Sequence, residues 1–244
     1  MLPRGASHLH LSRGERFGLA VGSAIAAFLD PERADMIALL GETTGAAALA
    51  RLRAQMRATP DGAWLLAHRP RVRGAAYEPA ALARSMPPRS FGAAYGEYMS
   101  LHGYSAEARA PVLFVADPEL AYVMARYREV HDFLHVLTGL PTSVVGEVAL
   151  KWLEMAQTGL PVAALSALVG PLRLAPRERA QLLGELAPWA LRTAAACPPL
   201  LAVRYEELLP LPLDEARARL RITPAPALAA AEAAAAAPPP PRLA

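Results

Sequence analysis

The stretch PELAYVMARYREVHDFLHVLTGLPTSVVGE (118–147) predicts the centre of the fold. Asp117 and Pro118 are preferred residues at the N-cap and first position of a helix, and Gly139 is preferred just past a helix end. We therefore expect one long helix over residues 118–138. Its apolar residues recur at the spacing that places side chains on one helix face: Leu120, Val123, Tyr127, Val130, Leu134 and Leu137.

Helix signals also dominate the rest of the chain, and no segment alternates apolar and polar residues as a half-buried strand would. A second helix should begin at Thr142 or Ser143 and end near Gly159. A capping-box pattern at Ser12 predicts another helix that runs to about Asp30. The expected fold class is therefore all-α, a single-domain helical bundle with a metal site on a helix hairpin and an apolar lipid pocket.

Other breaks in the helical pattern occur at glycine and proline. GETTG (41–45) predicts a corner between two helices, with Thr43 or Thr44 as the N-cap of the second helix. A later helix should open at Pro176 and be bent or broken by Pro188.

The chain is more apolar than most soluble proteins, at 54% hydrophobic residues, yet no apolar run reaches the roughly 20 residues that a spanning helix needs. The extra apolar residues would suit a large core, a lipid-sized cavity or a membrane-facing surface. Glycine and alanine around 18–27 and 159–170 would leave room for a lipid chain, or would let helices pack closely. The sequence leaves both interpretations open.

Charge and cysteine content narrow the function further. The net charge is +3, and no basic run is interleaved with aromatics, which argues against a nucleic-acid partner. A small positive balance fits anionic lipid headgroups or an acidic substrate at least as well. The single cysteine, Cys197, allows no internal disulfide and indicates a reducing compartment.

The chain divides into three parts by composition. Residues 1–14 carry arginine and serine without acids and are weakly similar to a transit peptide. Residues 15–222 hold the helical signals, and the Ala/Pro-rich residues 223–244 are expected to be a disordered tail.

Two histidines stand four residues apart near the end of the expected long helix. His131 and His135 therefore share one helix face, and Asp132 borders it. Glu147 lies about one turn into the next helix, so an antiparallel hairpin would bring the four side chains to one height. Such a set suits zinc, and less well iron or manganese. From spacing alone, a metal site and ordinary hydrogen-bonded histidines are equally good interpretations.

Four side chains near this cluster are expected to have structural roles and not catalytic ones. Arg128 lies one turn before Asp132, and Lys151 lies one turn after Glu147, as in ordinary salt bridges along a helix. Tyr122 and Tyr127 are expected to be core residues.

The cluster resembles the ubiquinone (coenzyme Q) biosynthesis protein 4 family, whose hallmark is H-D-x-x-H, eleven residues and then E. This pattern is met here by His131, Asp132, His135 and Glu147. The likeness covers roughly residues 15–222. Other segments similar to the family are LGETTG (40–45), RPRV (69–72), ARAP (108–111), ELAYVMARYREVHD (119–132), GLPTSVVGE (139–147), KWLEMAQTGLP (151–161) and GPLRL (170–174).

The resemblance implies an all-helical protein attached peripherally to the matrix side of the mitochondrial inner membrane. It implies a role in ubiquinone synthesis, as organiser of the other biosynthetic enzymes in a complex and as a carboxy-lyase. The lyase would remove the C1 carboxylate of a 4-hydroxy-3-methoxy-5-polyprenylbenzoate-type precursor. By the family pattern, His131, Asp132, His135 and Glu147 would bind zinc, and no catalytic residue is assigned.

Two other functions stay open. One is a non-catalytic scaffold that binds a prenyl lipid and carries a structural metal. The other is a metal phosphohydrolase, although the usual distant histidine partner is missing and His102 is a poor substitute. Small-residue helix faces would also permit a homodimer.

Overall fold

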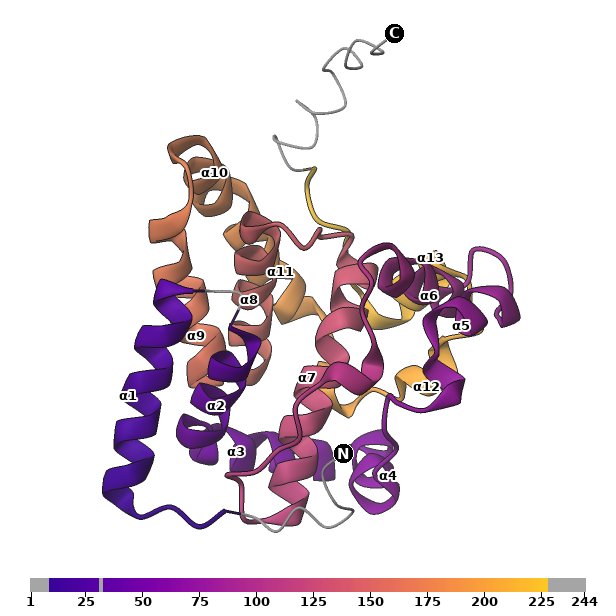
Figure 1. The fold of residues 1–244 in the computed structure, drawn as a ribbon. Helices are drawn as coiled ribbons and strands as arrows, with labels where there is room; N and C mark the ends of the chain where they lie inside the picture. Colours follow the sequence, from indigo (N-terminus) through magenta and orange to yellow (C-terminus); the bar gives the residue numbers. More distant parts are fainter. Residues whose placement is uncertain (1–8, 31–32, 228–244) are drawn as a thin grey trace, which may run out of the picture.

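Helices make up the regular structure of the described residues, 9–30 and 33–227, in the computed structural model (Figure 1). Within these ranges no strand occurs, and the one β-bridge joins Ser90 to Pro212. The prediction of an all-α, single-domain fold is confirmed. The elements are α1 (Arg13–Leu29), α2 (Ala34–Thr44), α3 (Ala46–Arg57), α4 (Pro60–His68), η1 (Ala75–Tyr77), α5 (Pro79–Ser85), α6 (Phe91–Leu101), η2 (Ala106–Ala108), α7 (Pro118–Thr138), α8 (Val144–Thr158), α9 (Pro161–Val169), η3 (Gly170–Arg173), α10 (Pro176–Gln181), η4 (Leu182–Leu186), α11 (Ala187–Ala196), η5 (Leu200–Ala202), α12 (Tyr205–Leu208) and α13 (Leu213–Leu220).

The helix hairpin α7–α8 has the ends that local sequence signals predict. The Asp117 carboxylate accepts hydrogen bonds from the first backbone N–H groups of α7, and Gly139 ends this helix at φ 74°. The Ser143 hydroxyl caps α8, and Gly159 ends it at φ 57°. Both glycines lie in the left-handed region, where a side chain would add strain.

Helix α7 passes through the middle of the molecule. In Figure 1, α1, α2, α8 and α9 lie on one side of it, and α5, α6, α12 and α13 lie on the other. Because α7 is buried, its charged residues need partners inside the protein. Four segments that are distant in sequence supply these partners at 2.5–2.6 Å: Arg126 pairs with Glu206, Arg128 with Glu42, Glu129 with Arg71, and Asp132 with Arg109.

The corner at GETTG differs from the prediction. Helix α2 continues through Thr43 and Thr44, whose hydroxyls donate to backbone carbonyls one turn earlier in the same helix. Gly45 forms the junction with α3, and no threonine caps that helix. The expected N-cap was wrong because a threonine hydroxyl can also bond backward within a helix.

The glycines Gly18 and Gly22 of α1 do not serve close helix packing. A Cβ added at Gly18 or Gly22 would meet no atom within 4 Å among the described residues. In contrast, a Cβ at Gly170 would lie 2.7 Å from the Val148 side chain, so the 159–170 segment does pack tightly. The apolar lipid pocket stays a prediction.

The expected break near Pro188 is present as a change of helical winding. Helix α10 passes through the wider π-helical turn η4 into α11, and Pro188 is the second residue of α11. This arrangement suits a residue that has no backbone N–H to donate.

Residues 223–227 lie against the body of the protein. The Trp189 indole N–H donates to the Thr223 carbonyl at 3.0 Å, and the Ala225 N–H donates to the Thr138 carbonyl at 2.8 Å. The remainder of the expected tail, 228–244, and most of the expected N-terminal segment, 1–8, lie outside the described residues. The three-part division of the chain stays a prediction.

The buried pair between Arg126 and Glu206 supplies a stability test. The Arg126 side chain has no exposed surface and also donates to the Val203 carbonyl. Glu206→Gln would leave a buried guanidinium without its counter-charge, so we expect a loss of about 3 kcal/mol in the free energy of unfolding. The neighbouring Glu207→Gln breaks only a more exposed pair with Arg204 and should cost less than about 1 kcal/mol. Equal urea-unfolding midpoints for the two variants would contradict this account.

Candidate metal centre

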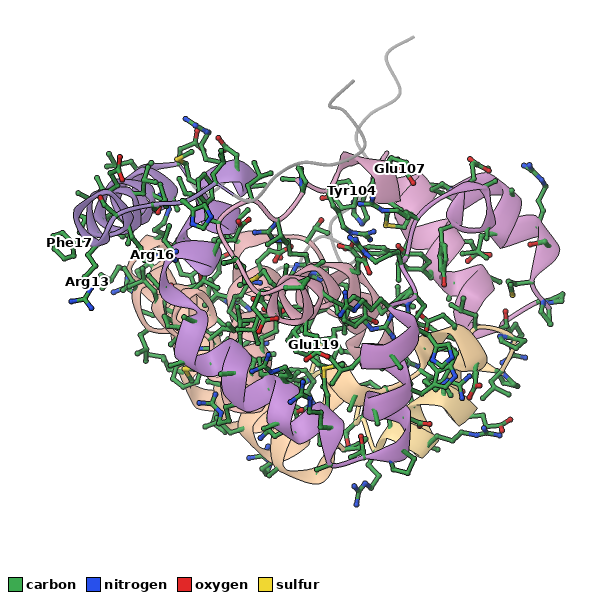
Figure 2. All side chains as sticks on the ribbon, turned by 90° about the horizontal axis from the view of Figure 1, so that it is seen from below. Arg13, Arg16, Phe17, Tyr104, Glu107 and Glu119 are labelled. Atoms are coloured by element: carbon green, nitrogen blue, oxygen red, sulfur yellow. The ribbon has the colours of Figure 1, made fainter. Side chains whose placement is uncertain are left out.

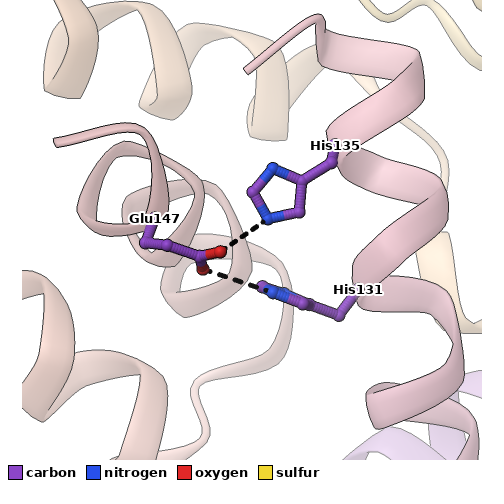
Figure 3. Close-up of side chains that lie close together, drawn as sticks. All are labelled: His131, His135 and Glu147. Atoms are coloured by element: carbon purple, nitrogen blue, oxygen red, sulfur yellow. Dashed lines mark ion pairs between the residues drawn. The ribbon is translucent and has the colours of Figure 1, made fainter. Parts of the chain in front are cut away.

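Two imidazoles of α7 converge on one carboxylate of α8 (Figure 3). The Glu147 Oε2 atom lies 3.3 Å from His131 Nε2, and Oε1 lies 3.1 Å from His135 Nε2. One ligand atom from each of the three residues lies within 4.8 Å of the others. The predicted hairpin geometry is thus present for three of the four predicted ligands.

The turn between the helices is tight, and its residues explain why Glu147 reaches the histidines. After Gly139, the chain needs only four residues before Val144 opens α8. A Cβ at Gly146 would lie 2.2 Å from the Pro141 carbonyl oxygen, so only glycine allows this return of the backbone. Glu147 then falls in the first turn of α8, opposite the last turns of α7.

The donor atoms fit a metal ion. His135 is buried, and its Nδ1 donates to the Leu140 carbonyl at 2.9 Å, which leaves Nε2 as the free ring nitrogen. That Nε2 is buried and faces Glu147 Oε1 at 3.1 Å, but it makes no hydrogen bond within the described part of the chain. A buried nitrogen without a hydrogen bond is costly unless something binds it. Two imidazoles and a carboxylate are also the donor types that zinc prefers.

The three side chains differ in their access to solvent. The His135 side chain is fully buried, the His131 side chain is 20% exposed, and the Glu147 side chain is 37% exposed. The centre is therefore closed at its base and open on the Glu147 side.

Electrostatics favour opposite charges on His131 and Glu147 when no metal is bound. Burial raises the pKa of Glu147, but its close contacts with the two imidazoles and their charge hold it well below its usual range. For His131, burial and the Lys151 charge lower the pKa, but the carboxylates of Glu154 and Glu147 outweigh them and raise it to about 9. A metal ion would therefore have to displace a proton from His131.

Asp132 lies beside the cluster but not in it. Its Oδ2 pairs with Arg109 Nη2 at 2.5 Å, and Arg109 also donates to the Tyr95 hydroxyl and the Val72 carbonyl. Its role as a ligand stays a prediction.

Both predicted salt bridges along the helices have other partners. Arg128 pairs with Glu42 at 2.6 Å rather than with Asp132. Lys151 pairs with Glu154 at 2.6 Å rather than with Glu147. Lys151 has acids at two helical spacings, which the sequence alone does not separate, whereas the partner of Arg128 comes from a different helix, α2.

Sequence reasoning missed two residues at the centre. Glu154, two helical turns after Glu147, accepts a hydrogen bond from His131 Nδ1 at 2.7 Å, and the Tyr127 hydroxyl donates to the same carboxylate. Tyr98 of α6 stacks on the His135 ring, with ring centroids 5.7 Å apart. The Tyr98 hydroxyl is buried and has no hydrogen-bond partner among residues 9–30 and 33–227. The spacing to Glu154 was a usable signal, whereas nothing local points to Tyr98.

The fold and the cluster define a class: an all-helical protein with a two-histidine, one-glutamate candidate metal centre on a hairpin of its central helix. The sequence profile of the coenzyme Q (ubiquinone) biosynthesis protein Coq4 family matches residues 6–226. The chain therefore belongs to the Coq4 family. The expected family is confirmed.

Individual relatives agree with this assignment. The Bos taurus mitochondrial ubiquinone biosynthesis protein COQ4 homolog is 47% identical over 206 residues, which are 84% of this chain and 77% of the relative. The Homo sapiens homolog is 45% identical over 204 residues, covering 84% and 77% of the two chains.

A crystal structure shares the fold. It is that of a candidate ubiquinone biosynthesis protein from Nostoc punctiforme, with a TM-score of 0.66 and 20% sequence identity. The match covers 84% of this chain and 97% of the other.

The raised pKa of His131 predicts how metal binding depends on pH. Below about pH 9 the metal must displace the His131 proton, so apparent affinity should rise about tenfold per pH unit and level off above that pH. Calorimetry at pH 7 in two buffers of different ionisation enthalpy should record about one proton released per ion from this residue. An affinity that is constant between about pH 6 and about pH 8 would contradict a ligand role for His131.

Proposed function

We propose that the chain acts in ubiquinone biosynthesis as a metal-dependent carboxy-lyase. The proposed substrate is a 4-hydroxy-3-methoxy-5-polyprenylbenzoate-type precursor, from which the C1 carboxylate is removed. In that reaction the bond between the ring and the carboxylate breaks, carbon dioxide leaves, and a proton takes its place on the ring. Membership of the Coq4 family supports the pathway, and the donor set of the candidate centre supports a metal.

His131, His135 and Glu147 would hold the metal, with Asp132 as a predicted fourth ligand. Zinc is the first choice for this donor set, and iron or manganese the second. When bound, such an ion supplies Lewis-acid stabilisation of negative charge on a substrate.

The observation that carries the catalytic proposal is the combination of three converging ligands with one open side. Catalytic zinc sites keep three protein ligands and leave a position for water or substrate, whereas structural sites are closed by four. Asp132 is engaged by Arg109, and the Glu147 side chain is 37% exposed. This arrangement corresponds to a three-ligand site and not to one closed by four protein ligands.

The chain's own residues would bind the aromatic head of the substrate. The Tyr98 ring lies against His135, and its hydroxyl is buried without a partner within the described ranges, so it would donate to a carboxylate or phenol oxygen. The isoprenoid tail would follow apolar helix surface, where each buried methylene contributes about 0.8 kcal/mol.

A second candidate function is a non-catalytic scaffold that binds a prenyl lipid and organises the other biosynthetic enzymes. The position of Asp132 favours the scaffold in one respect, because this residue lies next to the centre. If Asp132 broke its ion pair with Arg109, it could bind the metal as a fourth ligand and close the coordination. A closed four-ligand site would serve structure alone. Organisation of a complex with the other enzymes is compatible with either function.

We also propose peripheral attachment to the matrix side of the mitochondrial inner membrane through the outer face of α1. Related proteins carry mitochondrial names. No helix in the described part of the chain is long and apolar enough to cross a membrane. Figure 2 shows Phe17 and Arg13 pointing away from the body of the protein. The outer face of α1 is apolar along its length, with exposed Phe17, Val21, Ile25, Phe28 and Leu29.

The lyase proposal predicts loss of activity without the ligand carboxylate. Wild type loaded with metal should release carbon dioxide from a prenylated hydroxybenzoate, and Glu147→Ala should lower the rate at least roughly 100-fold with its helical content unchanged. Glu185→Ala, which changes an exposed residue of η4, is the matched control and should keep full activity. If fully loaded wild type releases no carbon dioxide, the scaffold is the better interpretation.

The membrane proposal predicts binding to vesicles through α1. Phe17→Asp combined with Ile25→Asp should weaken binding to anionic liposomes roughly tenfold or more in a flotation assay, because both side chains would lie in the apolar layer. Leu101→Asp changes an even more exposed apolar side chain, on α6, and should have little effect. Self-association through α1, seen as a concentration-dependent mass with no liposome binding, would instead assign this face to a homodimer.

A further inference from the structure

The carboxylate of Glu154 lies behind His131 at the centre of a buried polar group. Glu154 is 1% exposed and lies on α8, on the side of the His131 ring that faces away from Glu147. Its Oε1 lies 2.7 Å from His131 Nδ1. Its Oε2 accepts hydrogen bonds from Lys151 Nζ at 2.6 Å and from the Tyr127 hydroxyl at 2.7 Å. Both carboxylate oxygens are therefore held in place.

The contact with Glu154 decides where the His131 ring carries its hydrogen. A carboxylate that accepts from Lys151 and Tyr127 has no hydrogen of its own to donate, so the nitrogen 2.7 Å from it must be N–H. The Lys151 ammonium lies 3.4 Å from the same nitrogen and would favour the opposite tautomer, because an ammonium only donates. The shorter contact with a full negative charge should dominate. Nδ1 then carries the hydrogen, and Nε2 is left to face Glu147 and the candidate metal.

We propose that Glu154 is the positioning residue of the metal centre: it fixes the His131 ring with Nε2 directed at the metal, and the Lys151 ammonium holds Glu154 in place. Carboxylates in this relation to a ligand histidine fix its orientation and strengthen it as a ligand. The His135 ring is oriented by the backbone instead, because its Nδ1 donates to the Leu140 carbonyl. The two ligand histidines are thus oriented by different hydrogen bonds, and only that of His131 comes from a side chain.

Lys151 compensates the charge of the buried Glu154 carboxylate. An isolated carboxylate behind His131 would be costly to bury, and the ammonium balances its charge. Removing Glu154 alone would strand the Lys151 charge, so a loss of stability would accompany any loss of metal affinity. A variant that removes both charges is needed to separate these effects.

The proposal rests on the metal site proposed above, so the first experiment needs no metal. In the metal-free protein, nitrogen-15 spectra of the histidine side chains should show a hydrogen on His131 Nδ1 that exchanges slowly with water. Tyr127→Phe, which leaves the contact between His131 and Glu154 intact, should keep this signal. Glu154→Gln combined with Lys151→Met should lose it or exchange it rapidly. A His131 ring with its only hydrogen on Nε2 in wild type would overturn the proposal.

The second experiment measures metal affinity by competition with a zinc chelator. The Glu154→Gln, Lys151→Met variant should bind zinc roughly 10- to 100-fold more weakly than wild type. Tyr127→Phe should stay within about threefold, because its hydroxyl bonds the far oxygen of Glu154 and Lys151 Nζ, and leaves the Glu154 oxygen that faces His131 untouched. Thermal unfolding should show the double variant folded, since it contains no stranded charge.

The outcomes separate this proposal from the proposed function. If wild type binds no zinc but His131 shows the expected hydrogen on Nδ1, the metal site fails and the orienting role of Glu154 stands. If wild type binds zinc and the folded double variant binds it equally well, Glu154 has no positioning role.

Discussion

The contact of one carboxylate with two imidazoles across a tight helix turn is the feature on which the functional centre depends. Glu147 reaches His131 and His135 at 3.3 and 3.1 Å because Gly139 ends α7 in a left-handed conformation and α8 begins only a few residues later. In the absence of an ion, the negative charge of Glu147 and a proton on His131 stabilise each other. Once that proton leaves, the same three side chains can each offer one ligand atom to a metal ion.

This contact is held in place by the way α7 is buried. The helix carries charged residues on several faces, and each finds a partner in a segment distant in sequence, such as Arg109 for Asp132 and Glu42 for Arg128. Breaking such a pair is costly, so these ion pairs help to fix the segments around α7, together with its apolar contacts. The polar group of Glu154 and Lys151 extends the same pattern to the back of His131. The buried charges around α7 therefore contribute both to the fold and to the position of the candidate metal centre.

Much of the hairpin could be predicted because its signals are local. Asp117, Gly139 and Ser143 act within one turn of their own helix, so the ends of α7 and α8 and the meeting of the histidines with Glu147 follow from the sequence. Partners across the fold were not predictable in this way. Lys151 has acids in reach at two spacings, and only packing selects Glu154. Tyr98 reaches the centre from a separate helix, and no spacing rule connects it to His135.

Anomalous X-ray scattering at the zinc edge, from crystals of the zinc-loaded protein, tests the metal site most directly. We expect one strong peak within bonding distance of His131 Nε2, His135 Nε2 and a Glu147 oxygen, at about 2.0–2.2 Å. The same map would show whether Asp132 leaves Arg109 to become a fourth ligand. A peak that lies elsewhere, or no peak from protein that contains stoichiometric zinc, would contradict the assignment of these three residues.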